Sequence, residues 1–190
     1  MQNANKQLFI VILLISIMAA WRVVNTGLGI YHMVPMAALG LFSGSILSDR
    51  RWAYGIPLFA MFLSDLGLSI FTSMPGFYDF SQLVNYAALA SVVFLGAGLQ
   101  DRRAFNVAGY TLSGSLLFFL ISNFGTFLSG YYGYSIQGLI QCYTMAIPFY
   151  KSEIATQFFM NSLISDLLFS SIAFGIFYLA ITRQKQLAVA

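Results

Sequence analysis

Long uncharged stretches, separated by short clusters of charge, constrain this chain more than any other feature of its sequence. Only 8% of its 190 residues are Asp, Glu, Lys or Arg, whereas roughly a quarter of the residues in soluble domains are charged. An α-helix needs about 20 residues to cross the hydrocarbon core of a bilayer, and the uncharged stretches are long enough to do so. Their apolar residues run continuously and do not alternate with polar ones, which disfavours a transmembrane β-barrel. The sequence therefore predicts an all-α integral membrane protein with a single transmembrane domain over residues 1–190.

The charged clusters divide the chain into six predicted transmembrane helices. Asp49-Arg50-Arg51 follows the second helix and Asp101-Arg102-Arg103 follows the fourth. No convincing small-residue cleavage site follows the first apolar stretch, so we interpret it as a retained helix and not as a signal peptide. The predicted spans cover residues 7–24, 33–47, 54–72, 82–99, 105–123 and 154–181.

The segment 124–153 decides the topology, because it is rich in Gly, Ser and Tyr and contains a shorter apolar piece, 136–150. If this piece crossed the membrane, the chain would have seven helices and its basic carboxy terminus would lie opposite the two arginine pairs. If it is a re-entrant or lid segment instead, seven of the nine Lys and Arg residues lie on one side. The positive-inside rule favours the second arrangement. The seven residues are Lys6, Arg50, Arg51, Arg102, Arg103, Arg183 and Lys185.

We therefore expect a bundle of six transmembrane helices with a re-entrant or lid segment, 124–153, between the fifth and the sixth. The bundle would lie in the cytoplasmic (inner) membrane with both termini in the cytoplasm. Arg22 and Lys151 would lie outside, Arg22 as a cation that reaches the interface. Because non-helical backbone at membrane depth must be covered by protein or line a cavity, a folded lid implies a cavity that faces outward.

Asp65 and Asp166 are the most costly residues of the predicted spans, since an ionised carboxylate at a helix centre carries a penalty of roughly 2.5–3.5 kcal/mol. Two interpretations stay open for each. The carboxylate faces a cavity and binds a cation, a proton or a substrate, or it takes hydrogen bonds from neighbouring residues and only holds the helices together. The tripeptide Ser64-Asp65-Leu66 recurs as Ser165-Asp166-Leu167, which indicates either two related three-helix halves or a chance repeat.

Other polar residues could join the aspartates in one site. The amides of Asn85 and Asn123 lie on or at the end of two different spans, and the lid supplies Gln141 and Tyr143. Such side chains suit a planar organic ligand, although tyrosines also form interfacial aromatic belts. His32 and Cys142 do not have the spacing of a metal site, so we expect neither a metal nor a cofactor.

Several kinds of chemistry have no motif in this chain. It contains no phosphate-binding Gly and Lys loop, no helical pair of His residues and no serine nucleophile elbow, so we expect no enzymatic activity. The net charge of +3 comes from residues that flank helices and therefore does not indicate a nucleic acid partner.

Several segments together resemble a bacterial membrane family of unknown function, over most of the chain. That family is in turn similar to the S-components, the substrate-binding subunits, of energy-coupling-factor transporters. The segments are Ala38-Leu39-Gly40-Leu41-Phe42-Ser43-Gly44, Arg51-Trp52-Ala53, Pro57-Leu58, Leu63-Ser64-Asp65-Leu66, Ser122-Asn123-Phe124-Gly125, Cys142-Tyr143 and Ala146-Ile147-Pro148-Phe149.

The resemblance implies a subunit that captures a vitamin-like micronutrient from outside and works with a transmembrane coupling protein and two ATPase subunits. The small residues Ala37, Gly40 and Gly44 would be candidates for the coupling surface. The outward loops would be 25–33, 73–80 and 124–153.

The leading hypothesis is thus a substrate-capture subunit for a small molecule, and the alternative is a structural or assembly protein whose polar residues serve helix packing. A cavity of roughly 300 Å³ or more would favour the first. A third hypothesis, a membrane enzyme, requires the two aspartates to approach each other. The expected ligand contacts are Asp65, Asn123, Gln141 and Tyr143, with Asp166 and Asn85 as further candidates.

Overall fold

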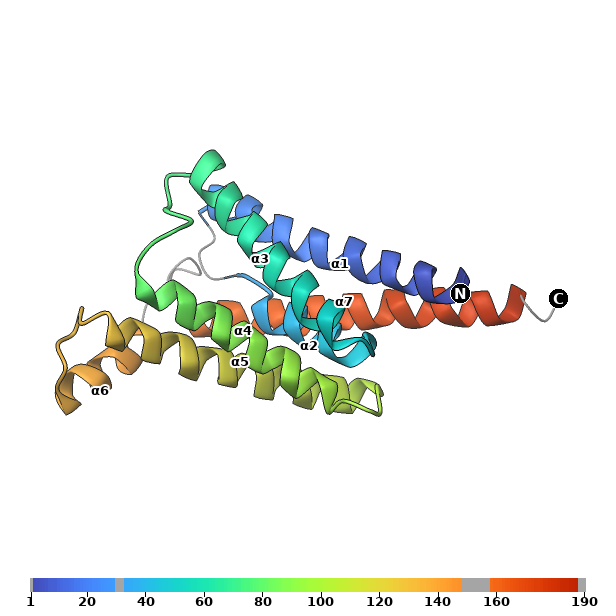
Figure 1. Cartoon of the computed structure of the whole chain (residues 1–190). Coiled ribbons are helices and arrows are strands. Elements are labelled where there is room, and N and C mark those ends of the chain that lie inside the picture. The colour runs from blue at the N-terminus through green and yellow to red at the C-terminus, as the bar shows by residue number, and fades with distance from the viewer. Residues whose placement is uncertain (1, 30–32, 148–157, 188–190) are drawn as a thin grey trace.

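The computed structural model describes residues 2–29, 33–147 and 158–187, and these residues form helices and connecting loops without a strand. The described residues contain seven helices, arranged as an elongated bundle (Figure 1). The helices are α1 (Gln2–Gly27), α2 (Met36–Ile46), α3 (Arg50–Phe71), α4 (Phe80–Ala97), α5 (Ala104–Leu128), α6 (Ile136–Met145) and α7 (Phe158–Leu187).

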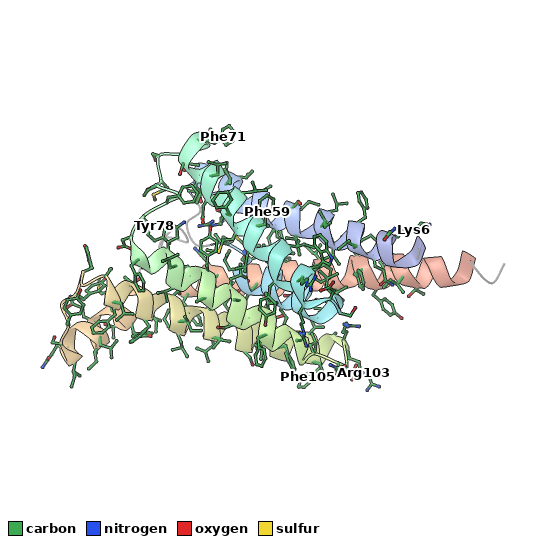
Figure 2. The ribbon with its side chains drawn as sticks, in the orientation of Figure 1. Lys6, Phe59, Phe71, Tyr78, Arg103 and Phe105 are labelled. Carbon is green, nitrogen blue, oxygen red and sulfur yellow. The ribbon has the colours of Figure 1, made fainter. Side chains whose placement is uncertain are left out.

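Five of these helices, α1, α3, α4, α5 and α7, are long and apolar enough to cross a membrane, with candidate spans of 18 to 25 residues. Large apolar side chains cover the outside of the bundle, and Figure 2 shows Phe59, Phe71 and Phe105 pointing away from it, with exposed fractions of 61%, 77% and 88%. Such a surface is suited to lipid and not to water. The chain is therefore a helical, multi-pass membrane protein.

The second predicted span, 33–47, differs from the expectation. α2 has 11 residues, which at 1.5 Å per residue is about 16 Å and too short for a bilayer core of about 30 Å. The expected count of six full-length spans is therefore not confirmed. The chain reaches α2 through non-helical residues, and the backbone carbonyl of Met33 accepts hydrogen bonds from Trp21 Nε1 at 2.9 Å and Asn25 Nδ2 at 2.6 Å. These two bonds explain how non-helical backbone is tolerated inside the bundle.

α2 lies in the centre of the bundle, where residues 36–45 are all buried. Its small residues let α4 come very close: a Cβ atom added to Gly44 would lie 2.1 Å from the carbonyl oxygen of Val93, and one added to Gly96 would lie 2.6 Å from that of Leu41. Ala37, Gly40 and Gly44 are thus enclosed by the protein itself. They do not form the exposed coupling surface that the resemblance suggested.

The two ends of the bundle differ. Both termini lie at one end in Figure 1, together with the start of α3, which carries Arg50 and Arg51, and the α4–α5 connection, which carries Arg102 and Arg103. The opposite end holds α6 and the α3–α4 connection. α6 has 10 residues and is too short to cross a bilayer, so the arrangement with seven full-length spans is not seen. Residues 148–153 of the expected lid and the first residues of the expected sixth span, 154–157, lie outside the described part of the chain.

The close contact between α2 and α4 gives a first prediction. Gly44→Ala should lower the free energy of unfolding by about 2–3 kcal/mol, because the new methyl group overlaps backbone that cannot move aside as a side chain can. Thermal unfolding in detergent measures this effect. Gly55→Ala is the matched control, since a Cβ atom at Gly55 has open space and Ala favours a helix over Gly by about 1 kcal/mol. Equal melting temperatures for the two variants would show that the α2–α4 contact is not tight.

Candidate functional site

A cavity of about 410 Å³ opens at the end of the bundle that carries α6, and all seven described helices contribute to its wall. The wall combines aromatic rings, methionines, amides, hydroxyls and two charged groups. Its residues are Arg22, Val34, Met36, Met61, Tyr78, Asn85, Ser115, Phe118, Phe119, Ser122, Asn123, Thr126, Tyr132, Cys142, Met145, Ala146, Phe159, Ser162 and Asp166.

One side of the cavity rests on a buried ion pair. The side chains of Arg22 and Asp65 are 14% and 1% exposed, and Arg22 Nη1 donates to Asp65 Oδ1 and, at 2.7 Å, to Ser64 Oγ. The other carboxylate oxygen of Asp65 accepts from Gln82 Nε2 at 2.9 Å and from the Tyr86 hydroxyl at 2.6 Å. Both carboxylate oxygens of Asp65 thus accept hydrogen bonds behind Arg22. The ion pair, together with Gln82 and Tyr86, joins α1, α3 and α4.

The same group of residues fixes the α3–α4 connection over the cavity. Gln82 Nε2 also donates to the carbonyl of Gly76 at 2.9 Å, and Gln82 Oε1 accepts from the backbone N–H of Tyr78 at 3.1 Å. Asn85 Nδ2 donates to the Tyr78 hydroxyl at 2.6 Å. Burial raises the pKa of Tyr78, while the charge of Arg22 opposes this shift, so the hydroxyl remains protonated. The hydrogen bonds with Gln82 and Asn85 hold Tyr78 against the wall.

Asp166 performs a different task at the floor of the cavity. Its Oδ1 accepts from the backbone N–H of Ala38 at 3.0 Å, in the first turn of α2, and its Oδ2 accepts from Ser115 Oγ at 2.6 Å. The first N–H groups of a helix have no partner within the helix and carry a partial positive charge. Asp166 therefore caps a helix that begins inside the bundle, and its partners Ala38 and Ser115 differ from those seen for Asp65 among the described residues.

The structure brings three of the six predicted contact residues to the cavity wall: Asn85, Asn123 and Asp166. The other three lie elsewhere. Asp65 is 0% exposed behind Arg22, Gln141 is exposed on α6, and the Tyr143 hydroxyl donates to the carbonyl of Leu120 at 2.6 Å. Whether the three wall residues contact a ligand stays a prediction.

Sequence reasoning missed Arg22 as part of the site, because it placed this residue at the outer interface. A basic residue near the end of one span and an acid within another are a signal for an ion pair at membrane depth, and this signal was available. Gln82 and Tyr86 were missed as well. They lie four residues apart on α4, on one face of the helix.

Cys142 is the one cysteine of the sequence, and it lines the cavity with 2% of its surface exposed. Burial raises the pKa of its thiol. No cluster of three His, Cys, Asp or Glu side chains suited to a metal ion occurs among the residues that could be placed. His32 lies outside the described ranges, so the sequence-based argument about it is not tested.

The geometry can be set beside known proteins. Residues 2–189 match the model of a family described as "Family of unknown function (DUF6580)". The chain is a member of this family. No curated protein and no solved structure matches it significantly. Membership of DUF6580 thus assigns no ligand, and function must be argued from the site itself.

The buried ion pair of this DUF6580 protein gives a second prediction. Asp65→Ala should destabilise the protein by about 3–5 kcal/mol, because it leaves the Arg22 guanidinium buried without its partner. Unfolding in detergent measures the loss. Arg22→Met combined with Asp65→Leu should recover much of it, since an apolar pair of similar volume leaves no unpaired charge.

Asp101→Ala is the matched control for this experiment. It removes an ion pair whose side chains are 53% and 86% exposed, and such pairs contribute about 0–1 kcal/mol. If Asp65→Ala were no more harmful than Asp101→Ala, the ion pair would not hold the bundle together.

Proposed function

We propose that this protein is a substrate-capture subunit, which binds a small organic molecule in the cavity from the extracytoplasmic side and passes it inward together with partner proteins. The observation that carries the proposal is the cavity itself. Its volume of about 410 Å³ lies within the range of roughly 300–1,000 Å³ of small-molecule sites. A protein that only scaffolds other membrane components has no need of such a space.

The composition of the wall supports binding of an organic molecule. Apolar ring faces come from Phe118, Phe119 and Phe159. The ring centroids of Phe119 and Phe159 lie 4.6 Å apart. Asn85 and Asn123 add hydrogen-bonding groups to the same wall. A mostly apolar wall with a few placed polar groups is typical of small-molecule sites.

The direction of binding follows from the charges. The arginine pairs and both termini share one end of the bundle (Figure 1), and the positive-inside rule assigns such an end to the cytoplasm. The cavity opens at the opposite end, so it would face outward in the cytoplasmic membrane. In this proposal α6 and the residues around it form the lid, and α2, with the non-helical residues before it, makes the additional crossing of a six-segment bundle.

An energy source must come from elsewhere, because the sequence has no ATP-binding motif. The proposed partners are a transmembrane coupling protein and ATPase subunits, as the similarity to S-components implies. With Ala37, Gly40 and Gly44 enclosed, a coupling protein would have to bind another surface of the bundle.

A structural role has support of its own for part of the polar residues. Every carboxylate oxygen of Asp65 and Asp166 is hydrogen-bonded within the protein, so the two acids stabilise the fold with or without a ligand. The alternative of a structural or assembly protein extends this role to the whole chain, and ligand binding separates the two proposals.

The third prediction tests capture. In a thermal-shift screen of the purified protein against vitamins, their precursors and related ring compounds, a ligand at 100 times its Kd stabilises the folded state by about 2.7 kcal/mol. Asn123→Leu should weaken binding of that ligand at least tenfold, or about 1.4 kcal/mol. Gln141→Leu, on the exposed face of α6, should leave it unchanged. A screen without any stabilising compound would favour the structural alternative.

The fourth prediction tests the orientation. In a Cys142→Ala background, Gln141→Cys should react with a membrane-impermeant maleimide in intact cells, because α6 lies at the outward end. Gln100→Cys, in the exposed α4–α5 connection, should react only after the cells are permeabilised. The reverse pattern would place the cavity on the cytoplasmic side and exclude capture from outside.

A further inference from the structure

We propose that the cavity selects an uncharged, ring-bearing molecule over ions of either sign, because groups of the protein itself already pair with or hydrogen-bond to both charged residues of the cavity wall. This inference rests on the proposed function and deepens it, since it states the class of substrate. Arg22 and Asp166 are the two described wall residues whose side chains, free in water, are charged at neutral pH.

The positive charge is balanced behind the wall. Arg22 donates a hydrogen bond to Asp65. The other partners of the Asp65 carboxylate among the described residues, Gln82 and Tyr86, are uncharged donors. Arg22 and Asp65 together therefore have no net charge. A carboxylate or phosphate of a ligand could reach the guanidinium, but it would bring a second negative charge to a cation that is already paired.

The negative charge of Asp166 is compensated in part by donors within the wall. Asp166 accepts the N–H of Ala38 at the amino terminus of α2 and the hydroxyl of Ser115. A helix amino terminus is equivalent to about half a positive charge, and α2 is 11 residues long with its first turn buried. An ammonium group of a ligand would have to compete with these donors for the same oxygens.

A charged ligand would therefore meet no free counter-charge on the described wall of the cavity. Transferring an ion from water to a wall that offers it no counter-charge is unfavourable. An uncharged ligand avoids this cost.

Two amides of the described wall offer hydrogen-bonding groups to a ligand. Asn85 and Asn123 each use one N–H group, toward the Tyr78 hydroxyl and the carbonyl of Phe119 at 2.8 Å. Within the described part of the chain, the second N–H donor and the carbonyl acceptor of each amide have no hydrogen bond. Such donor and acceptor pairs match the edge of an uncharged ring that bears amide, lactam or hydroxyl groups, while Phe118, Phe119 and Phe159 match its faces.

Cys142 allows a test that needs no knowledge of the ligand, because it is the one cysteine of the chain and it lines the cavity. Three thiosulfonate reagents would be compared in the purified protein: neutral methyl methanethiosulfonate, its anionic sulfonatoethyl analogue and its cationic trimethylammonium analogue. For each reagent, the rate at Cys142 is divided by the rate with Gln141→Cys in a Cys142→Ala background. That variant reports the reactivity of an exposed thiol on the same helix.

We expect the neutral reagent to exceed both charged reagents at least tenfold after this correction. Asp65→Asn should raise the rate of the anionic reagent alone, because it leaves the charge of Arg22 unbalanced beside the cavity. Asp101→Asn, the same substitution at the other end of the bundle, should change none of the rates. An anionic or cationic reagent that matched the neutral one in the parent protein would overturn the inference, and this result does not depend on whether Asp65→Asn folds.

Matched ligand pairs separate this inference from the proposed function. Nicotinamide and nicotinate, thymidine and thymidine monophosphate, and riboflavin and its 5′-phosphate would be tested for protection of Cys142 against the neutral reagent. Stronger protection by the uncharged member of any pair supports the inference. Stronger protection by the charged member overturns it while leaving capture intact. Absence of protection by all six compounds, together with a flat thermal-shift screen, overturns both.

Discussion

Backbone groups that lie at membrane depth must find hydrogen-bond partners within the protein, and the rest of this structure depends on how that requirement is met around α2. The chain enters the bundle without helical structure and then forms a short helix, so carbonyls and N–H groups of this segment lack the partners that a continuous helix would give them. Trp21 and Asn25 on α1 bind the carbonyl of Met33, and Asp166 on α7 binds the N–H of Ala38. Two helices, α1 and α7, thereby hold α2 in place.

The cavity is a consequence of this arrangement. A helix that spanned the whole bilayer at the position of α2 would fill the centre of the bundle at both ends. Because α2 begins only at Met36, the centre is packed at the end that holds the basic loops and open at the other. The ion pair of Arg22 and Asp65 and the bonds from Gln82 to the α3–α4 connection then stabilise the walls around the open part.

The sequence was sufficient to predict the helical membrane class, since charge content and the length of uncharged stretches depend on composition alone. It also placed Asn85, Asn123 and Asp166 among candidates that the fold does bring to one cavity. It did not predict the shortness of α2, because residues 33–47 are uncharged throughout and hydropathy does not distinguish a helix from an extended segment that is covered by protein. The pairing of Arg22 with Asp65 joins residues 43 apart. The sequence offers a cation and an acid in two spans, and the packing of α1 on α3 determines that these two meet.

The close contact of Gly44 and Gly96 with the backbone of the neighbouring helix has a mechanical consequence. Backbone atoms in direct contact leave no room for one helix to slide or tilt against the other, so α2 and α4 behave as one rigid unit at the end with the basic loops. At the end with α6, the helices are joined by side-chain hydrogen bonds around an open space, and such bonds can exchange partners. Any movement that admits or releases a molecule must therefore pivot about the glycine contact, with its largest amplitude at the mouth of the cavity.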